Sequence, residues 1–191
     1  MQAMVSSTKK PATYQDLCDL PENQVGELLD GELFASPRPA SPHTFAGSAL
    51  GGELFGPFQK GVGGPGGWWI LDEPELHFGR DVLVPDLAGW RRERMPEIRD
   101  EPYFTLAPDW LCEIVSPSTA RLDRIRKLPK YAAAGVRHAW LLDPLGRTLE
   151  VYELQGQRWS LAATHEGDEK VRAAPFDAIG LELGALWLSP G

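Results

Sequence analysis

The sequence is poor in cysteine and contains no long hydrophobic run, and each shortage excludes a class of protein. Cys18 and Cys112 are the two cysteines, far apart and without CxxC spacing, which argues against a disulfide scaffold and favours two reduced thiols. No apolar stretch is long enough to cross a bilayer, and polar residues 1–11 show no secretory pattern. We therefore expect a soluble, cytoplasmic protein with no membrane partner.

Positive charge is also scarce. The chain has 19 lysine and arginine residues against 27 aspartate and glutamate residues, which gives a formal net charge of -8. A protein that coats nucleic acid usually neutralises phosphates with a broad basic face. The acidic balance argues against such a role. It still allows a local cleaving site in which a divalent cation offsets part of the negative charge.

The composition is that of a globular protein able to bury its own core. Of 191 residues, 42% are hydrophobic and 24% are charged. No internal repeat or linker divides the chain. We expect residues 1–12 to be a flexible lead-in and residues 13–191 to form a single domain.

Capping and turn residues predict the first elements. Thr13 is suited to cap a short helix that Pro21 stops. The dipeptide Asp30-Gly31 supplies the positive φ angles of a tight turn, so residues 27–34 are predicted to form a hairpin.

A second helix is predicted to start at Ser41-Pro42, with Ser41 as the N-cap and Pro42 as the first helical residue. Three glycines weaken this helix, each by about 1 kcal/mol relative to alanine. Its apolar stripe would consist of Phe45, Ala49, Leu54 and Phe58.

The remainder of the chain is rich in strand-like segments. These are residues 68–71, 75–78, 83–90, 110–115 and 138–142, followed by a hairpin of residues 148–154 and 158–163. Residues 116–135 favour a helix that ends at Gly135, with either a late start or a kink imposed by Pro129. The strand–helix–strand order over residues 111–142 indicates a βαβ-like unit within a mixed sheet.

Two carboxylates stand where apolar residues are expected. Asp86 follows Pro85 inside a strand-like run, and proline is confined to strand ends, edges or bulges, so we expect the sheet to be distorted there. Glu113 lies inside an apolar run, where an unpaired carboxylate is costly. Neighbouring strands are about 4.8 Å apart, so the two carboxylates could share one hard cation. Alternatively, both side chains simply face solvent by strand alternation.

These residues belong to a longer series that resembles a known family. The series contains, in chain order, Pro85-Asp86, residues 113–119, Asp123, Lys127, Tyr131, Gly135-Val136 and residues 140–144. Residues 30–33 and Ser41-Pro42-His43 match its N-terminal half. Over residues 13–155 the chain resembles the Uma family, a bacterial family of restriction-endonuclease-like proteins within the PD-(D/E)XK nuclease superfamily.

The resemblance implies an α/β (α+β) fold: a central mixed sheet flanked by helices, with an N-terminal hairpin extension. It also implies that Asp86 and Glu113 are catalytic residues and ligands of Mg²⁺ or Mn²⁺. Val115 stands where the superfamily motif has lysine. The resemblance implies that the basic residue has moved onto the following helix, to Lys127, with Lys130 in reserve.

Four further residues are candidates for supporting roles. Glu32 and His43 occupy positions like those of the family, and Glu53 lies in the segment from which the superfamily often supplies another acidic residue. Tyr131 could pack in the core with its hydroxyl at the rim of the site. From the residues alone, Lys127 could also be a solvated helix residue that pairs with Asp123 at i,i+4.

The leading hypothesis is metal-dependent hydrolysis of phosphodiester bonds in nucleic acid, most simply DNA. The alternatives are a non-catalytic nuclease-fold module that binds a protein or nucleic-acid partner, and a metal hydrolase of small molecules. Large aromatic residues and exposed strand edges favour a homodimer. The tryptophans in strand-like segments are expected in the core or a subunit interface: Trp68, Trp69, Trp90, Trp110 and Trp140.

Overall fold

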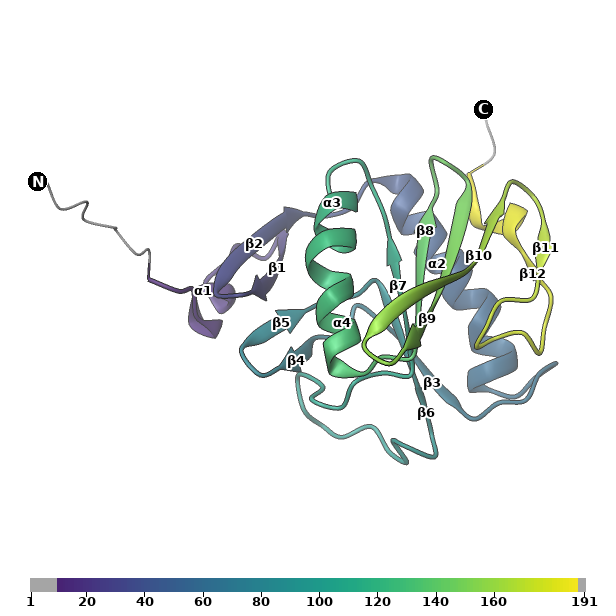
Figure 1. The fold of residues 1–191 in the computed structure, drawn as a ribbon, viewed down its shortest axis with the longest axis horizontal. Coiled ribbons are helices and arrows are strands. Elements are labelled where there is room, and N and C mark those ends of the chain that lie inside the picture. Colours follow the sequence, from purple (N-terminus) through teal and green to yellow (C-terminus); the bar gives the residue numbers. More distant parts are fainter. Residues whose placement is uncertain (1–9, 189–191) are drawn as a thin grey trace, which may run out of the picture.

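A six-stranded mixed sheet forms the centre of the fold (Figure 1) in the computed structural model, which describes residues 10–188. The strand order is β10-β9-β8-β7-β6-β3. The bounds are β3 Trp68–Asp72, β6 Leu87–Arg91, β7 Trp110–Ile114, β8 His138–Asp143, β9 Thr148–Gln155 and β10 Arg158–Glu166. Strands β7 and β8 are parallel, whereas the other neighbours are antiparallel. The predicted mixed sheet is confirmed.

A smaller antiparallel sheet has the order β2-β1-β5-β4. Its strands are β1 Gln24–Leu29, β2 Glu32–Pro37, β4 Leu76–Phe78 and β5 Asp81–Leu83. The predicted hairpin joins β1 to β2, and its turn residues Asp30 and Gly31 have φ angles of 54° and 77°. The β1–β2 hairpin is the predicted N-terminal hairpin extension, and it joins β5 through the pair of Leu28 and Val82.

The first helix, α1 (Tyr14–Cys18), starts where its capping residue predicts. Thr13 is the N-cap and forms a capping box with Asp16. Residues 1–9 of the predicted lead-in lie outside the described part of the chain. Within the remainder, the Ala12 N–H donates to the Gly31 carbonyl at 2.8 Å, so the chain touches the hairpin turn before α1 begins. Cys18 and Cys112 are both free thiols.

One face of the large sheet is covered by α2 (Ser41–Leu54), which continues as η1 (Phe55–Gln59). The N-cap is Ala40, so the prediction that Ser41 caps the helix is off by one residue. Of the predicted stripe, Leu54 and Phe58 are buried and Ala49 is half-buried, whereas Phe45 is 40% exposed and the prediction is wrong for it. Ala46 and Leu50 are the other buried residues of α2.

Two glycines determine which side of α2 faces the large sheet. A Cβ on Gly47 would lie 3.1 Å from Ile114 Cδ1, and one on Gly51 would lie 3.4 Å from Leu87 Cδ2. The glycine side of the helix therefore lies against the sheet, where a larger residue would hold the two apart. This close approach turns Phe45 toward solvent.

The opposite face is covered by one helical segment that connects β7 to β8. It consists of α3 (Ala120–Leu122), a π-helical turn η2 (Asp123–Lys127) and α4 (Leu128–Ala134). Gly135 ends it in the left-handed conformation, with φ 83°, as predicted. The predicted late start is confirmed, since the helix begins at Ala120. The π-helical turn directly precedes α4, and Pro129 lies in the first turn of α4, where its missing N–H costs no helical hydrogen bond.

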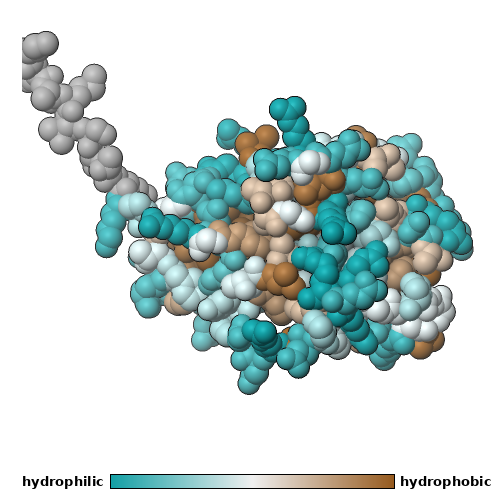
Figure 2. Space-filling view, turned by 60° about the horizontal axis from the view of Figure 1, so that its bottom comes forward, coloured by the Kyte–Doolittle hydropathy of each residue, from teal (hydrophilic) through white to brown (hydrophobic). Residues whose placement is uncertain are grey.

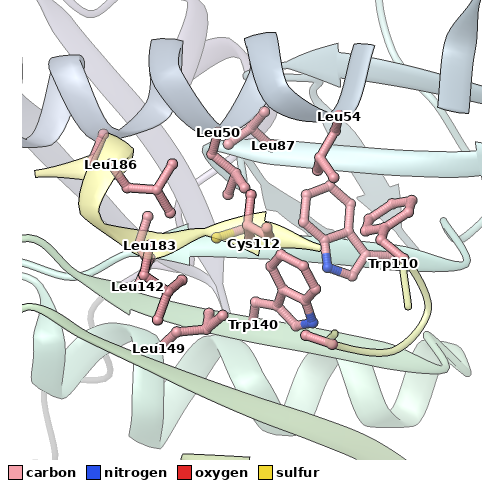
Figure 3. Packing of buried hydrophobic residues seen from close by; sticks show 14 of the residues in the cluster. Leu50, Leu54, Leu87, Trp110, Cys112, Trp140, Leu142, Leu149, Leu183 and Leu186 are labelled. Carbon is pink, nitrogen blue, oxygen red and sulfur yellow. The ribbon is translucent and has the colours of Figure 1, made fainter. Parts of the chain in front are cut away.

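Alternate residues of the strands pack against these two faces. Figure 3 shows one of the cores, in which Leu50 and Leu54 of α2 meet Trp110, Cys112 and Trp140 of the sheet. The other core lies between the sheet, α4 and the small sheet. Trp68, Trp90, Trp110 and Trp140 are buried, which confirms the core prediction for these four, and Trp69 is half-buried.

The C-terminal segment completes the core on the α2 side. It contains β11 (Lys170–Val171), β12 (Leu181–Glu182) and the 3-10 turn η3 (Leu183–Leu186), whose leucines Leu183 and Leu186 are fully buried. Hydrophilic residues dominate the face seen in Figure 2, and hydrophobic residues gather there in small groups. Among the helices of residues 10–188, none combines the length and the apolar character needed to span a membrane.

Candidate active site

The run of residues 83–90, predicted as one strand, is split at Asp86. Strand β5 ends at Leu83 in the small sheet, and β6 begins at Leu87 in the large sheet. The predicted distortion is therefore confirmed, since Val84, Pro85 and Asp86 form the passage between the sheets. Asp86 accepts a hydrogen bond from the Ile114 N–H at 2.6 Å, which anchors its carboxylate to the end of β7.

Glu113 lies on β7, one residue beyond the pair formed by Leu87 and Cys112, and therefore beside Asp86. Its side chain is 3% exposed, so the alternative that it faces solvent by alternation is wrong. Tyr131 of α4 donates a hydrogen bond of 2.6 Å to Glu113 Oε1. Lys127 Nζ lies 3.0 Å from Glu113 Oε2.

Lys127 is the last residue of the π-helical turn η2, and its side chain points toward Glu113 of β7 instead of into solvent. Its side chain is 4% exposed and lies 2.9 Å from Glu113 Oε1 and 3.9 Å from Asp123 Oδ1. The alternative of a solvated pair between Asp123 and Lys127 is therefore wrong, because both side chains are buried. The structure brings Asp86, Glu113 and Lys127 together in the lining of one cleft.

Two carboxylates of this site were missed from the sequence. Glu27 of β1 is 8% exposed, accepts the Val84 N–H at 2.8 Å and lies 2.8 Å from Lys127 Nζ. Asp123 was identified in the motif but assigned to the surface. The available signal for Glu27 was its place directly before Leu28 and Leu29, which are buried in the hairpin.

His43 joins the site from α2, on the other side of Asp86. Its Nε2 lies 2.6 Å from Asp86 Oδ1, and its side chain is 16% exposed. Tyr131 is fully buried and touches Glu113, so two of the four supporting candidates lie at the site.

The other candidates lie elsewhere. Glu32 is at the hairpin tip, 3.1 Å from Arg126, and Glu53 is exposed on α2. Lys130, the reserve for Lys127, pairs with Asp30 and with Asp81, the latter at 2.8 Å. Neither these two acidic residues nor Lys130 lines the cleft described below.

A cleft of about 660 Å³ opens over these groups. Its lining includes residues of the hairpin, Arg38 of the link to α2, His43 of α2 and the loop from β7 to α3. The charged residues Glu27, Glu73, Asp86, Glu113, Asp123 and Lys127 are also part of the lining. Among the two motif carboxylates in this lining, Asp86 is 20% exposed and Glu113 is 3% exposed.

Burial and crowding of carboxylates change the proton affinities in the site. Burial raises the pKa of Glu113 well above its usual range, although Lys127 opposes this. Burial also raises the pKa of Asp123, to about 6. Burial alone would lower the pKa of Lys127, but Glu113, Glu27 and Asp123 hold it well above its usual range. The lysine is therefore a fixed cation.

His43 responds to two opposing effects. Burial lowers the pKa of the imidazole, but the hydrogen bond and charge of Asp86 outweigh it, so that the pKa is raised overall. Burial raises the pKa of the Tyr131 hydroxyl, and the charge of Glu113 acts in the same direction. Tyr131 therefore stays neutral and donates to the Glu113 carboxylate.

The donor set suits a hard divalent cation. Asp86 and Glu113 offer carboxylate oxygens, which Mg²⁺ and Mn²⁺ prefer. Residues 10–188 contain no group of three or more histidine, cysteine, aspartate or glutamate side chains arranged to hold a metal ion. Mg²⁺ is commonly bound by one or two carboxylates, with water and substrate phosphate completing the shell. The pair thus fits an ion that keeps much of its water.

A mixed sheet with helices on both faces and a carboxylate cleft at one end places the chain in the class of nuclease folds. The crystal structure of a putative nuclease belonging to DUF820 from Anabaena variabilis ATCC 29413 matches it with a TM-score of 0.70 and 24% identity, over 92% of this chain and 97% of that chain. At this identity the likeness shows the fold.

The family follows from the sequence itself. The family Uma2, described as "Putative restriction endonuclease", matches residues 11–185, and the chain belongs to it. This confirms the resemblance found in the motifs. No curated protein matches the chain.

Proposed function

We propose that the protein is a metal-dependent endonuclease that hydrolyses phosphodiester bonds of DNA. The observation that carries this proposal is the convergence of Asp86, Glu113 and Lys127 in the lining of one cleft. Two carboxylates that can hold a cation, with an ammonium beside them, form a set suited to stabilising charge on a phosphate. The family description supports DNA as the substrate.

In this proposal, bound Mg²⁺ or Mn²⁺ supplies Lewis-acid chemistry: it lowers the pKa of a water and offsets charge on the scissile phosphate. Asp86 and Glu113 hold the ion. His43 and the Ile114 N–H orient the Asp86 carboxylate, each over 2.6 Å, and Tyr131 orients that of Glu113. Such fixed partners keep the ligands in place.

Lys127 contributes positive charge that does not depend on pH in the neutral range. Its ammonium lies beside Glu113, and its raised pKa keeps it protonated. A cation already in place can stabilise negative charge that develops on the phosphate without reorganising the site. Lysine differs from arginine in carrying a compact point charge on a flexible four-carbon stem, which lets the ammonium reach the site from the η2 turn.

Nicking of supercoiled plasmid DNA in Mg²⁺ or Mn²⁺ tests the proposal. Asp86→Ala and Glu113→Ala should each remove at least about 99% of the nicking, since loss of positioned electrostatic groups typically costs about 100-fold or more. Glu32→Ala and Glu53→Ala remove exposed carboxylates outside the cleft and should nick like wild type. Equal nicking by wild type and both site variants would sink the proposal.

A non-catalytic nuclease-fold module is the second candidate. It is favoured by one observation: both oxygens of Glu113 already have partners, in Lys127 and Tyr131. Calorimetry separates the two functions. Mn²⁺ binding that disappears in Asp86→Ala and Glu113→Ala supports the nuclease, whereas no such binding supports the module.

The proposal also includes a cytoplasmic location and a homodimer. DNA substrate and two free thiols agree with the cytoplasm. Strands β3 and β10 are the edges of the large sheet, and an edge strand can pair with a second copy. Light scattering of the full chain decides the oligomer: a mass of one chain contradicts the dimer.

A further inference from the structure

The edges of the two sheets differ in how many of their backbone groups are already bound. At the β3 edge, the Ile70 N–H donates to the Gln59 side chain at 2.8 Å, and the Trp68 carbonyl accepts from Arg92 at 3.2 Å. Beside β4, Phe104 forms a parallel bridge with the strand. Other parts of the same chain therefore cover these two edges, which leaves fewer backbone groups for another strand.

Strand β10 (Arg158–Glu166) is the other edge of the large sheet, and within residues 10–188 its backbone hydrogen bonds are to β9 alone. At nine residues it is longer than β2, the remaining edge, which has six and ends at Pro37. It contains neither proline nor lysine, which often protect edge strands from pairing. Leu161 is 53% exposed, and Ala162 and Thr164 are also exposed. The strand therefore presents a long row of backbone groups that a further strand can bind.

The side chains of β10 complement those of a second β10 that runs in the opposite direction. If the two strands are centred on Ala162, Arg158 of each copy lies opposite Glu166 of the other copy, at both ends of the pair. Directly opposite side chains in an antiparallel pair have Cβ atoms about 5 Å apart on one face of the sheet, where opposite charges attract. Within one chain the same two residues are exposed and about 26 Å apart along the strand. A second copy can therefore pair charges that are too far apart to pair with each other.

A β-bulge at Ala162 fits the same arrangement. The pairing of β10 with β9 shifts between Leu161 and Ala163, so Ala162 is the additional residue on β10. A two-fold axis through Ala162 places the bulge of one copy opposite the bulge of the other. Neither strand then has an unmatched residue, and the charged ends stay in register. The centre of the pair carries only apolar side chains, so the pairing buries no charge there.

We propose that β10 pairs in an antiparallel direction with β10 of a second copy of this chain, centred on Ala162, so that the two large sheets join into one. This rests on the homodimer included in the proposed function and names the surface that forms it; it does not depend on metal-dependent cleavage. No residue of β10 lines the cleft, so the pairing leaves the cleft of each copy accessible. A single pair of edge strands is a small interface compared with the standard of about 1,600 Å², so we expect a dimer that dissociates on dilution.

Sedimentation velocity of the full-length wild type, over a concentration series in the micromolar range, should show a monomer–dimer equilibrium. Leu161→Lys places like charges close to the two-fold axis and should raise the dissociation constant at least about tenfold. Val62→Lys is the matched control, since this apolar residue is 71% exposed in the loop between η1 and β3, and it should dimerise like wild type. A wild-type dissociation constant in Leu161→Lys overturns the inference, and so does an equal loss of dimer in Val62→Lys.

Charge reversal tests the register of the two strands. Arg158→Glu and Glu166→Arg each place like charges opposite one another at both ends of the pair, and each should raise the dissociation constant about tenfold. The double variant restores opposite charges at both ends and should regain the wild-type dissociation constant. A double variant that dimerises as weakly as the single variants overturns the inference.

The outcomes separate this interface from the rest of the proposed function. A wild-type protein that is monomeric at every concentration overturns the homodimer together with the interface. A wild-type dimer that none of the β10 variants weakens leaves the homodimer standing and overturns the interface. Cleavage is tested separately, by plasmid nicking with Asp86→Ala and Glu113→Ala.

Discussion

Tyr131 helps to hold the Glu113 side chain in place through a single hydrogen bond. It is fully buried and donates a 2.6 Å hydrogen bond to the carboxylate. Tyr131→Phe leaves a buried, charged acceptor with one partner fewer, so we expect the free energy of unfolding to fall by about 1.5–3 kcal/mol in urea titrations.

Tyr152→Phe is the control for this change. Tyr152 also donates to a glutamate at 2.6 Å, but its partner Glu150 is 22% exposed and retains Arg124. We expect a loss below about 1 kcal/mol, because water can replace the hydroxyl. Equal losses in the two variants would contradict the buried environment assigned to Glu113.

Asp123 makes stability depend on pH. Burial raises its pKa from 3.8 to about 6, so the folded state holds the proton more tightly than the unfolded chain. The stabilisation from protonation is fully present below about pH 4 and is lost as the pH rises through 6. Compared with Asp123→Asn, wild type should lose about 2 kcal/mol more between pH 4 and pH 7, measured by urea unfolding in EDTA. Parallel pH profiles would refute this.

At the residue scale, the sequence predicts those site residues that break a local pattern. Asp86 and Glu113 interrupt apolar runs, so their charge is conspicuous. Glu27 interrupts nothing, because a glutamate next to leucines in a hairpin is ordinary. Its buried partners, Lys127 and the Val84 N–H, lie far from it in the sequence. Asp123 was misplaced for the same reason: its spacing to Lys127 is that of an exposed pair.

At the scale of elements, the glycines of α2 have different roles that substitutions can separate. A Cβ on Gly52 would meet nothing within 4 Å, whereas one on Gly47 would lie 3.1 Å from Ile114. Gly52→Ala should therefore raise the free energy of unfolding by about 0.5–1 kcal/mol, through helix propensity alone. Gly47→Ala should fall short of that gain by about 1 kcal/mol, because the helix or Ile114 must shift. Equal increases in the free energy of unfolding for the two variants would show that the packing of α2 on the sheet does not require a glycine at position 47.

Most elements could be predicted because their signals are local. Thr13, the Asp30-Gly31 turn and Gly135 act on their immediate neighbours, and all three mark real boundaries. The rotation of α2 could not be predicted, since it depends on contact between its glycines and the sheet. The position of the π-helical turn could not be predicted either. Pro129 predicts an irregularity in the helix, but tertiary packing determines at which residues it occurs.

At the scale of the whole molecule, the scarcity of positive charge predicts weak dependence of DNA binding on salt. In the cleft, Arg38 is exposed, whereas Lys127 is saturated by carboxylates. If the proposed function is right, the logarithm of the binding constant should fall against the logarithm of salt with a slope no steeper than about −3. Fluorescence anisotropy in Ca²⁺ over a KCl series measures it. A slope of about −6 or steeper would reveal a basic surface that the account lacks.

The order of strands also has a part that was predictable and a part that was not. The strand–helix–strand unit requires a parallel pair, and β7 and β8 form it. The splitting of residues 83–90 between two sheets depends on the pairing of β5 with β1, which brings Val82 beside Leu28. These residues are far apart in the sequence, so no local turn signal predicts the pairing. Pro85 predicts a distortion there but not which sheet each half joins.

The central claim is that Asp86 and Glu113 hold one divalent cation beside Lys127. The most direct test is the anomalous scattering of Mn²⁺ in a crystal of the wild-type protein soaked in Mn²⁺. We predict one peak in the cleft, in contact with both carboxylates, with the Lys127 ammonium still among Glu27, Glu113 and Asp123. No peak at Asp86 and Glu113, or a peak where the ammonium lies, would contradict the account.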